Sequence, residues 1–294
     1  MKLINSSFEI IEQKPGLEGM WKHVEKCART AYMSADSITE DSYKRFLKML
    51  YDRGHWSCFE HATVYMIYKY DNDQTMPDII TFYDKNPYSR IFTLQHEFST
   101  TVYITTNMRV ILEHDRMEDV DKYWSEKTMY HIPRYSVRMV SDIGVSREGN
   151  RHRNSITESS TRYCNFSKEK FGNELSIMRN SDIIQSEFYP IEVMHEFILN
   201  ENARCTTDDY WYAANIFCEF CYMQLLKKGW TPQQARRILP LDLKTEVVYT
   251  AFIEDWVHLL NLRTAPDAHP DFREIAIPLK NEFITRGYIN GSLQ

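Results

Sequence analysis

The segment Asn150-Arg-His-Arg-Asn-Ser-Ile-Thr-Glu-Ser-Ser-Thr-Arg-Tyr163 combines positive charge with hydroxyl groups. Its arginines carry planar guanidinium groups that can donate paired hydrogen bonds to phosphate oxygens. The serines and threonines add uncharged donors, and Glu158 adds an acceptor. This mixture is typical of a site for a phosphorylated ligand with a polar sugar, such as a nucleotide. From the residues alone, the alternatives are a solvated basic turn and a patch that binds an RNA backbone.

The composition is that of an ordinary globular protein. Of 294 residues, 43% are hydrophobic and 14% aromatic, which is enough to build a core. The formal net charge of −6 argues against a general nucleic-acid binder. No apolar run approaches the ~20 residues that span a bilayer, and the N-terminus has no apolar signal region, so we expect no membrane association. Six dispersed cysteines favour reduced thiols and a cytoplasmic location.

No repeat or flexible linker interrupts the chain, so we expect a single domain over residues 1–294. Hydrophobic periodicity predicts helices over 16–31, from Ser37 or Thr39 to Gly54, 108–112, 208–228, from Thr231 onward, 252–262 and 272–286. The second of these helices begins with a predicted capping box, Ser37-Ile-Thr-Glu40. Alternating aromatic and β-branched residues predict strands over 61–70, 100–105 and 135–143. Strands early and long helices late indicate an α+β fold, with a mixed or antiparallel sheet flanked by long helices.

Two further segments carry polar residues that the fold alone does not require. Gly54-His-Trp-Ser-Cys-Phe-Glu-His61-Ala-Thr63 contains two histidines and a glutamate, but no cluster completes a metal site at recognisable spacing, so we expect no bound metal. Near the C-terminus, Arg236 lies in Ala-Arg-Arg-Ile-Leu-Pro240, and Arg263 ends an apolar helix. Taken alone, Arg263 is explained by the helix dipole, which favours a cation at the C-terminal end.

Together these three segments resemble the flavin-dependent thymidylate synthase family. The family signature is Arg-His-Arg, a short spacer and then Ser-x-Arg-Tyr, which reads here as Arg151-His-Arg153 and Ser160-Thr-Arg162-Tyr163. The Gly-His-x-x-x-Phe-Glu-His, Ala-Arg-x-x-Leu-Pro and Asn-Leu-Arg blocks occur in the family's order. Shorter members have far fewer residues between Glu-His and Arg-His-Arg, so residues 71–134 look like an insertion within the domain.

The resemblance implies reductive methylation of dUMP to dTMP. Its implied cofactor is FAD, reduced by NADPH, and its carbon donor is 5,10-methylenetetrahydrofolate. It also implies a homotetramer whose active sites are shared between subunits. Arg263 matches the arginine that stabilises the N3-deprotonated uracil; a fixed cation beside an imide lowers the pKa of the imide and makes C5 more nucleophilic. No enzyme nucleophile is then needed, and Ser160 has no adjacent base in the sequence to activate it.

The resemblance also assigns binding residues by position. Those that match dUMP contacts are Glu148, Gly149, Asn150, Arg151, Glu158, Ser159, Ser160, Thr161, Arg162, Arg236 and Arg263, with the first four supplied by a neighbouring subunit. Those that match FAD contacts are Thr63, Arg151, His152, Arg153, Glu158, His258 and His269.

The sequence departs from the family pattern where many members carry Asn-x-Arg for flavin, eleven and nine residues before the activating arginine. Those positions hold Phe252 and Glu254, and a later asparagine is replaced by His258. A carboxylate cannot reproduce the contact of an arginine, so flavin binding there must differ. The competing interpretation is a non-catalytic nucleotide- or RNA-binding protein that kept the basic segment and lost flavin.

Overall fold

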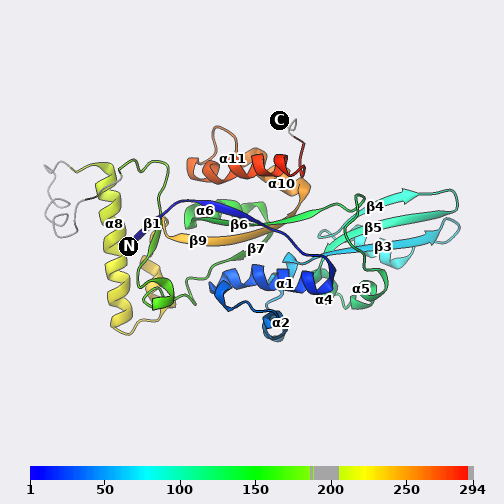
Figure 1. Cartoon of the computed structure of the whole chain (residues 1–294), viewed down its shortest axis with the longest axis horizontal. Helices are drawn as coiled ribbons and strands as arrows, with labels where there is room; N and C mark the ends of the chain where they lie inside the picture. The colour runs from blue at the N-terminus through cyan, green and yellow to red at the C-terminus, as the bar shows by residue number, and fades with distance from the viewer. Residues whose placement is uncertain (186–187, 189–204, 291–294) are drawn as a thin grey trace.

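The computed structural model describes residues 1–185, 188 and 205–290. The molecule is elongated, with a four-stranded sheet at its centre, a long helix at one end and a three-stranded sheet at the other (Figure 1). Helices and antiparallel sheets occupy separate layers, which confirms the predicted α+β class. None of the helices in the described residues combines the length and apolarity that crossing a bilayer requires.

The central sheet is antiparallel throughout, in the order β2-β6-β9-β7. Its strands are β2 (Ser7–Ile11), β6 (Arg134–Asp142), β9 (Lys244–Phe252) and β7 (Ser155–Glu158). The register places Arg134 opposite Phe252, and Ser155 opposite Thr250. The beginning of β6, the end of β9 and the beginning of β7 therefore meet at one corner of the sheet.

Only β6 of this sheet is among the predicted strands. The inner strand β9 is absent from the prediction because its sequence, KTEVVYTAF, does not alternate between apolar and polar residues. Tyr249 and Ala251 face the cluster formed with the C-terminal helices, whereas Val248 packs with Ile11 and Cys27 on the other face. A strand covered on both faces has no need to alternate, so periodicity does not reveal it.

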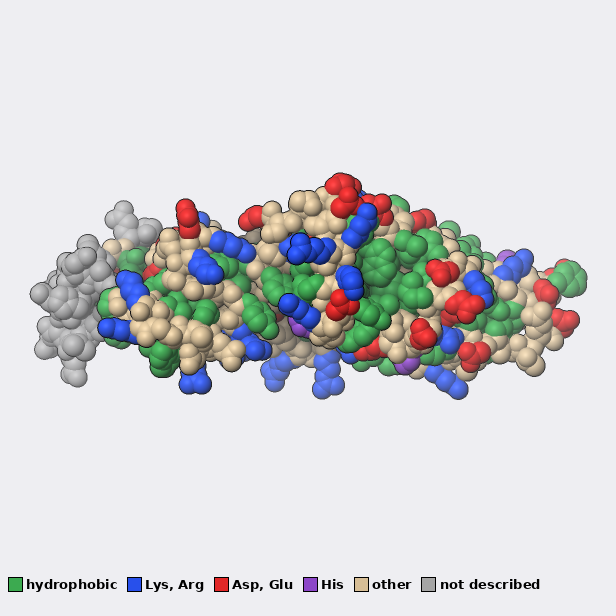
Figure 2. All heavy atoms as spheres, turned by 90° about the horizontal axis from the view of Figure 1, so that it is seen from below, with side chains coloured by type: hydrophobic (Ala, Val, Ile, Leu, Met, Phe, Trp, Pro, Cys, Tyr) green, Lys and Arg blue, Asp and Glu red, His purple; other side chains and the backbone are tan. Residues whose placement is uncertain are grey.

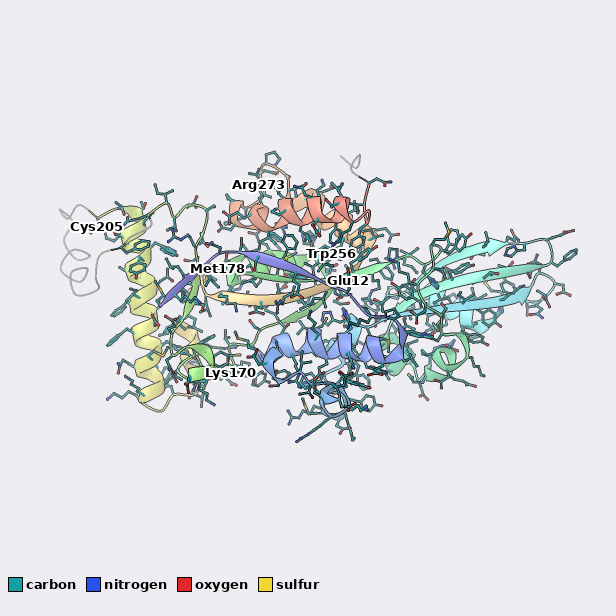
Figure 3. The ribbon with its side chains drawn as sticks, in the orientation of Figure 1. Glu12, Lys170, Met178, Cys205, Trp256 and Arg273 are labelled. Carbon is teal, nitrogen blue, oxygen red and sulfur yellow. The ribbon has the colours of Figure 1, made fainter. Side chains whose placement is uncertain are left out.

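Helices cover both faces of the central sheet. α10 (Ile253–Arg263) and α11 (Pro270–Thr285) lie on one side, and α1 (Gly16–Ala28) and α2 (Ser42–Asp52) on the other (Figure 1). These helices agree with the predicted ranges. Trp256 of α10 is fully buried and donates its indole N–H to the carbonyl of Tyr135 at 2.9 Å (Figure 3). The C-terminal helices are therefore fixed to β6 by both packing and a hydrogen bond.

The predicted capping box at Ser37–Glu40 is wrong. α2 begins at Ser42 after Asp41, and no side chain caps it; residues 35–37 form a separate 3-10 turn, η2 (Ala35–Ser37). The predicted end of this helix is confirmed, because Gly54 has a φ of +70°, which glycine adopts without strain.

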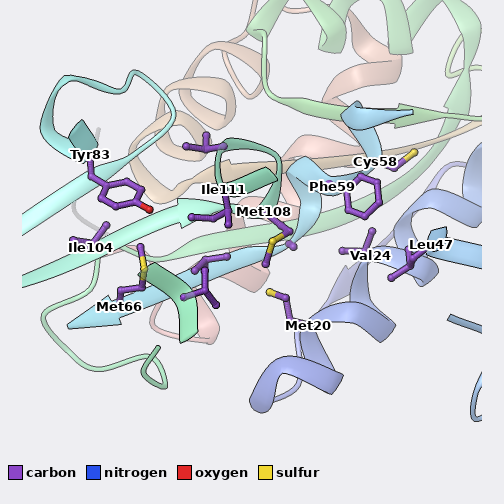
Figure 4. Close-up of a cluster of buried hydrophobic side chains, with 14 of the residues drawn as sticks. Met20, Val24, Leu47, Cys58, Phe59, Met66, Tyr83, Ile104, Met108 and Ile111 are labelled. Carbon is purple, nitrogen blue, oxygen red and sulfur yellow. The ribbon is translucent and has the colours of Figure 1, made fainter. Parts of the chain in front are cut away.

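The three-stranded sheet has the order β3-β5-β4, and its strands are β3 (Thr63–Asp71), β5 (Ser99–Asn107) and β4 (Arg90–Gln95). Three short helices pack against it: α3 (Asp78–Lys85), α4 (Met108–Glu113) and α5 (Met117–Tyr123). Strands β3 and β5 and helix α4 were expected, and β4, α3 and α5 were not. A shared core joins this sheet to α1 and α2 and includes Met20, Phe59, Met66 and Met108 (Figure 4). Residues 71–134 thus pack into the main body of the protein.

The opposite end is formed by α8 (Thr207–Lys227), which starts at a capping box between Thr206 and Asp209. Beside it, β1 (Lys2–Ile4) pairs in parallel with β8 (Ser176–Met178), and α9 (Pro232–Ala235) begins at the expected Thr231 cap. Phe217 and Phe220 on α8 are 65% and 54% exposed. On the face shown in Figure 2, acidic and basic side chains are interspersed and no single large basic patch forms.

Candidate functional site

The signature segment lies on two turns that flank β7. Strand β6 leads into α6 (Ile143–Gly149), whose first turn is capped by the Asp142 side chain accepting from the Val145 N–H at 2.7 Å. A 3-10 turn, η4 (Asn150–His152), follows, and Arg153 has a φ of +56°. β7 then pairs with β9 and leads to the turn that contains Ser159 and Ser160. Hydrogen bonds to β9 therefore fix the spacing between the basic and hydroxyl halves of the segment.

The hydroxyl half opens into a cavity of about 580 Å³, which we call the signature pocket. It is lined by Ile143, Ser146, Arg147, Glu158, Ser159, Ser160, Thr161, Arg236, Arg237, Leu239, Pro240, Leu241 and Thr245. Five predicted dUMP residues line it together: the consecutive Glu158, Ser159, Ser160 and Thr161, and the distant Arg236. Three arginines against one glutamate give the pocket a net positive charge suited to a phosphate.

Hydrogen bonds hold the polar wall of the signature pocket in place. Glu158 Oε1 accepts from Ser146 Oγ at 2.6 Å and from Thr245 Oγ1 at 3.0 Å. Ser159 Oγ accepts from the backbone N–H of Glu246 at 3.1 Å, and Thr245 Oγ1 lies 3.0 Å from it. The wall is therefore ordered by the chain itself, as a binding surface requires.

Four polar residues of this pocket were missed from the sequence: Ser146, Arg147, Arg237 and Thr245. Arg147 and Arg237 are exposed and form no hydrogen bond or ion pair within the described residues, so both guanidinium groups are available to a ligand. Arg147 lies one helical turn before Arg151, and Arg237 is adjacent to Arg236. The clustering of basic residues in the sequence could have indicated Arg147 and Arg237. No local sequence signal indicates that Thr245 lines the pocket.

Arg162, by contrast, does not line the signature pocket. Its side chain is exposed, its Nε donates to Gln233 Oε1 at 3.3 Å, and its guanidinium lies 5.4 Å from the ring centre of Tyr163. Arg151 is also exposed.

Arg263 lies at the end of α10 in a separate cluster. Its Nη1 is 2.7 Å from Glu148 Oε2, its Nη2 donates to the Glu148 carbonyl at 3.0 Å, and its Nε donates to His152 Nε2 at 3.1 Å. Burial, and then the Arg263 charge, lower the pKa of His152 to about 4. His152 is therefore neutral near pH 7, and its Nε2 can accept from the guanidinium. The same cluster includes His258, whose ring centre is 5.9 Å from that of His152.

Within one chain, Arg263 is not among the residues that line the signature pocket. Ser146 contacts Glu158 at that pocket, whereas Glu148 contacts Arg263. Residues two positions apart on a helix point to different faces, so α6 separates the two groups. The predicted residues Gly149 and Asn150 lie between them.

Gly149 is required by close packing. A Cβ at this position would lie 2.3 Å from the hydroxyl oxygen of Tyr249, which donates to Asn150 Oδ1 at 3.1 Å. Asn150 in turn reaches Glu158 Oε2 at 3.4 Å. The glycine therefore allows a hydrogen-bonded path from the central strand to the signature pocket.

The predicted FAD residues are distributed over several places. His152 and Arg153 line a cavity of about 190 Å³ at the corner where β6, β7 and β9 meet, which we call the junction pocket. Thr63 is buried on β3, lines a neighbouring cavity of about 460 Å³, and lies 3.5 Å from an Arg134 nitrogen. Arg134 lines both cavities and so connects them. His269 is the residue before the first turn of α11, forms no side-chain capping bond, and lines none of these three cavities.

The histidine of the Glu-His pair has a structural role. His61 is fully buried, with Nδ1 2.7 Å from Thr250 Oγ1 and Nε2 2.8 Å from Thr157 Oγ1. Burial lowers its pKa to about 3, so the ring is neutral. It ties the 3-10 turn η3 (Trp56–His61) to β7 and β9. No group of three potential metal ligands occurs within the described part of the chain.

The fold and the site define an α+β protein with an ordered pocket lined by three arginines. Residues 114–286, more than half of the chain, match the model of the family described as "Thymidylate synthase complementing protein". The chain belongs to this family, which agrees with the resemblance drawn from its sequence motifs.

Curated relatives match over shorter segments. A flavin-dependent thymidylate synthase of Thermus thermophilus is 40% identical over 55 residues, which is 19% of this chain and 20% of that protein. A probable flavin-dependent thymidylate synthase of Paramecium bursaria Chlorella virus 1 is 35% identical over 63 residues, or 21% and 29% of the two chains. The chain thus matches less than a third of the length of these relatives.

Among solved structures, the UMP/dUMP methylase PolB from Streptomyces cacaoi, bound with 5-Br dUMP, aligns over 97% of this chain and 93% of its own. The sequence identity is 16% and the TM-score is 0.41.

Proposed function

We propose that this protein is a flavin-dependent thymidylate synthase that converts dUMP to dTMP. In the balanced reaction, dUMP loses the C5 proton and gains a methyl group; methylenetetrahydrofolate becomes tetrahydrofolate, and NADPH supplies the hydride through FAD. The observation that carries the proposal is the convergence of Glu158, Ser159, Ser160, Thr161 and Arg236 on one positively charged pocket.

The signature pocket suits a nucleoside monophosphate. Arg147, Arg236 and Arg237 provide charged donors for the phosphate, and forked guanidinium groups bind such an anion with defined geometry. Thr161 and Ser160 add hydroxyls for the sugar and base. The pocket has a volume of about 580 Å³, within the range of small-molecule sites.

Arg263 is proposed to stabilise the N3-deprotonated uracil. A guanidinium is charged at every physiological pH, and Glu148 and His152 hold this one in a fixed orientation. A preorganised cation beside the developing imide anion lowers the barrier without moving any charge of its own. The negative charge then resides on the ring and activates C5 toward the one-carbon unit.

An enzyme nucleophile is not part of the proposal. No cysteine is among the described residues that line the signature pocket. Burial raises the pKa of Cys58 to about 11 and also raises the pKa of the Cys164 thiol, so neither is a thiolate near pH 7. Ser160 has no histidine, lysine or carboxylate hydrogen-bonded to its Oγ within the described residues, so no base activates it.

The residues at the junction pocket fit FAD. Arg134 is buried, yet its Nε has no hydrogen-bond partner, and Asn154 Nδ2 is likewise buried without one. Buried donors of this kind are costly unless an acceptor reaches them, and the phosphate oxygens of a dinucleotide are acceptors. His152 and Arg153, which the family resemblance assigns to FAD, line the same cavity. When bound, FAD supplies the hydride that the reaction requires.

A shared active site accounts for the separation of Arg263 from the signature pocket. If Glu148 and Arg263 of one subunit complete the pocket of another, the two groups need not meet within a chain. The exposed Phe217 and Phe220 on α8 support burial of that helix in an assembly, because large exposed aromatics are unusual on a monomer. We propose a homotetramer on this basis.

The test is spectroscopic and enzymatic. Purified protein should show a flavin absorption band, should oxidise NADPH faster when dUMP is added, and should form dTMP only when methylenetetrahydrofolate is present. Protein that remains colourless after incubation with FAD, and that binds single-stranded RNA instead, would support the non-catalytic alternative.

A further inference from the structure

The junction pocket contains an arginine that the sequence motifs do not indicate. It is lined by Pro87, Tyr88, Arg90, Asn107, Arg134, His152, Arg153, Asn154, Ser155, Thr250, Ala251, Phe252 and Asp255. Arg90 begins β4 and comes from residues 71–134, the predicted insertion. Residues from distant parts of the sequence, Arg90 and Phe252, are therefore neighbours here.

The pocket carries a net positive charge. Arg90, Arg134 and Arg153 provide three cations, and Asp255 is the carboxylate among the lining residues. His152 is neutral near pH 7. Burial lowers the pKa of Arg134 to about 10, so this side chain also stays charged near neutral pH. Arg153 is exposed and has no hydrogen bond or ion pair in the portion of the chain that the structure describes.

Arg134 is held in place but is not satisfied. The residue is nine-tenths buried or more, and its Nη2 donates to the Glu60 carbonyl at 2.9 Å and to Ser155 Oγ at 3.1 Å. Its Nε has no partner. A buried, charged, partly unpaired guanidinium is stable only if something on the protein or bound to it compensates the missing hydrogen bond.

Phe252 and Glu254 hold the side chain of Arg90 in place. The guanidinium carbon of Arg90 lies 4.6 Å from the ring centre of Phe252, and that of Arg134 lies 5.4 Å from the same ring. Glu254 Oε2 is 3.7 Å from Arg90 Nε. The arginine also donates to the backbone carbonyls of Pro87 and Ser89 at 3.1 and 2.9 Å. Stacking, an ion pair and backbone bonds thus fix Arg90 at the pocket.

These contacts give a reason for the two departures from the family pattern. A cation expected at position 254 is replaced by a carboxylate, and that carboxylate pairs with a cation that enters from β4. The expected asparagine is replaced by an aromatic ring that stacks with the same cation. The positive charge is kept at this place, but a different segment of the chain supplies it.

We propose that Arg90, together with Arg134 and Arg153, binds the diphosphate group of a dinucleotide in the junction pocket. Phe252 and Glu254 are the positioning residues of Arg90. The identity of the dinucleotide as FAD rests on the proposed function; the anion site itself rests on the contacts above. A role follows for residues 71–134, which bring the cofactor-binding arginine into the site.

The test measures the apparent Kd of the whole chain for FAD, ADP and riboflavin by isothermal titration calorimetry, without substrates. Arg90→Ala should weaken FAD binding by roughly tenfold or more, because a charge-assisted hydrogen bond is lost. It should weaken the binding of ADP, which carries the diphosphate without flavin, by a similar factor. The binding of riboflavin, which has no phosphate, should be unchanged. Arg45→Ala, which removes an exposed arginine on α2, is the control matched in charge and should have no effect.

A second variant tests the exchange of charge between segments. Glu254→Arg in the Arg90→Ala background should restore part of the FAD affinity, because it returns the cation to the position of the family pattern. Thermal melting of each variant shows that it is folded.

The outcomes separate the two proposals. FAD binding by folded Arg90→Ala with the affinity of the unmodified protein overturns the role of Arg90 and leaves the proposed function standing. Equal losses for FAD and riboflavin also overturn it, because the effect is then not on a phosphate. Arg90-dependent binding of ADP by a protein that takes up no flavin supports the anion site and refutes the proposed function.

Discussion

Arg263, the last residue of α10, forms an ion pair with Glu148 near the end of α6, with 2.7 Å between Nη1 and Oε2. The two residues are far apart in the sequence, and the turn that carries His152 adds a neutral acceptor to the same guanidinium. The side chain is 17% exposed, so the cation is largely shielded from water yet not sealed. This is the arrangement expected of a cation that must act on a ligand without moving.

Replacing Arg263 by alanine should strongly slow dTMP formation while FAD stays bound. The loss in kcat should be about 10²- to 10³-fold, the size expected when one preorganised donor to a developing anion is removed. The kcat of Arg263→Lys should lie between that of the unmodified protein and that of Arg263→Ala, because lysine keeps the charge but loses the planar fork. Product analysis measures dTMP formation, and the flavin absorption band shows whether FAD stays bound. Full dTMP production by Arg263→Ala would remove the role we assign to it.

Mixing two inactive variants should restore activity if the site is shared. Arg263→Ala and Arg236→Ala each lack one half of the proposed site, and co-refolding places intact halves next to each other. In an equal mixture, each half of a site has about one chance in two of coming from the variant in which that half is intact. About a quarter of the sites then have both halves intact, so random assembly should restore about a quarter of the original activity. The measurement is dTMP formation by the mixture against each variant alone. No recovery would indicate that both halves act within one chain.

The cysteines should be dispensable for catalysis. Cys58→Ala, Cys164→Ala and Cys218→Ala should each keep dTMP formation, because burial disfavours the thiolate at all three positions. The buried positions Cys58 and Cys164 should cost about 1 kcal/mol of stability, as typical core substitutions do. Loss of activity together with loss of a covalent dUMP adduct in any of them would contradict a reaction without an enzyme nucleophile.

Folding stability should fall as the pH drops from about 6.5 toward 4. The pKa of His61 in the folded protein is about 3 and that of His23 about 4, both below the ordinary value of 6.5. In this window the unfolded chain binds protons that the folded chain does not, so acid favours unfolding. Each such histidine contributes a slope of about 1.4 kcal/mol per pH unit.

Denaturant titrations at several pH values measure this slope. His61→Gln should be less stable at every pH, because it disturbs the hydrogen bonds to Thr157 and Thr250, but its slope should be shallower by the contribution of one histidine. An unchanged slope would show that His61 is not the group that titrates.

The sequence alone identified much of this protein because the relevant signals are local. The helices α1, α8, α10 and α11 follow from apolar periodicity, and Gly54 and Gly229 end helices where a positive φ is needed. The hydroxyl half of the signature segment and Arg236, assigned to one ligand from the sequence, line the same cavity. These features depend on residue type and spacing over a few turns of chain.

Only the tertiary structure showed that β9 is an inner strand of the sheet, that Arg147 and Arg237 join the signature pocket, and that Arg90 stacks on Phe252 beside Glu254. Strand pairing and burial on both faces decide these relations, and they bring together residues far apart in the sequence. Local propensity carries no information on which distant segment will lie opposite. For this reason the sequence indicates only that Glu254 has lost a cofactor contact, whereas the fold shows that it is the partner of Arg90.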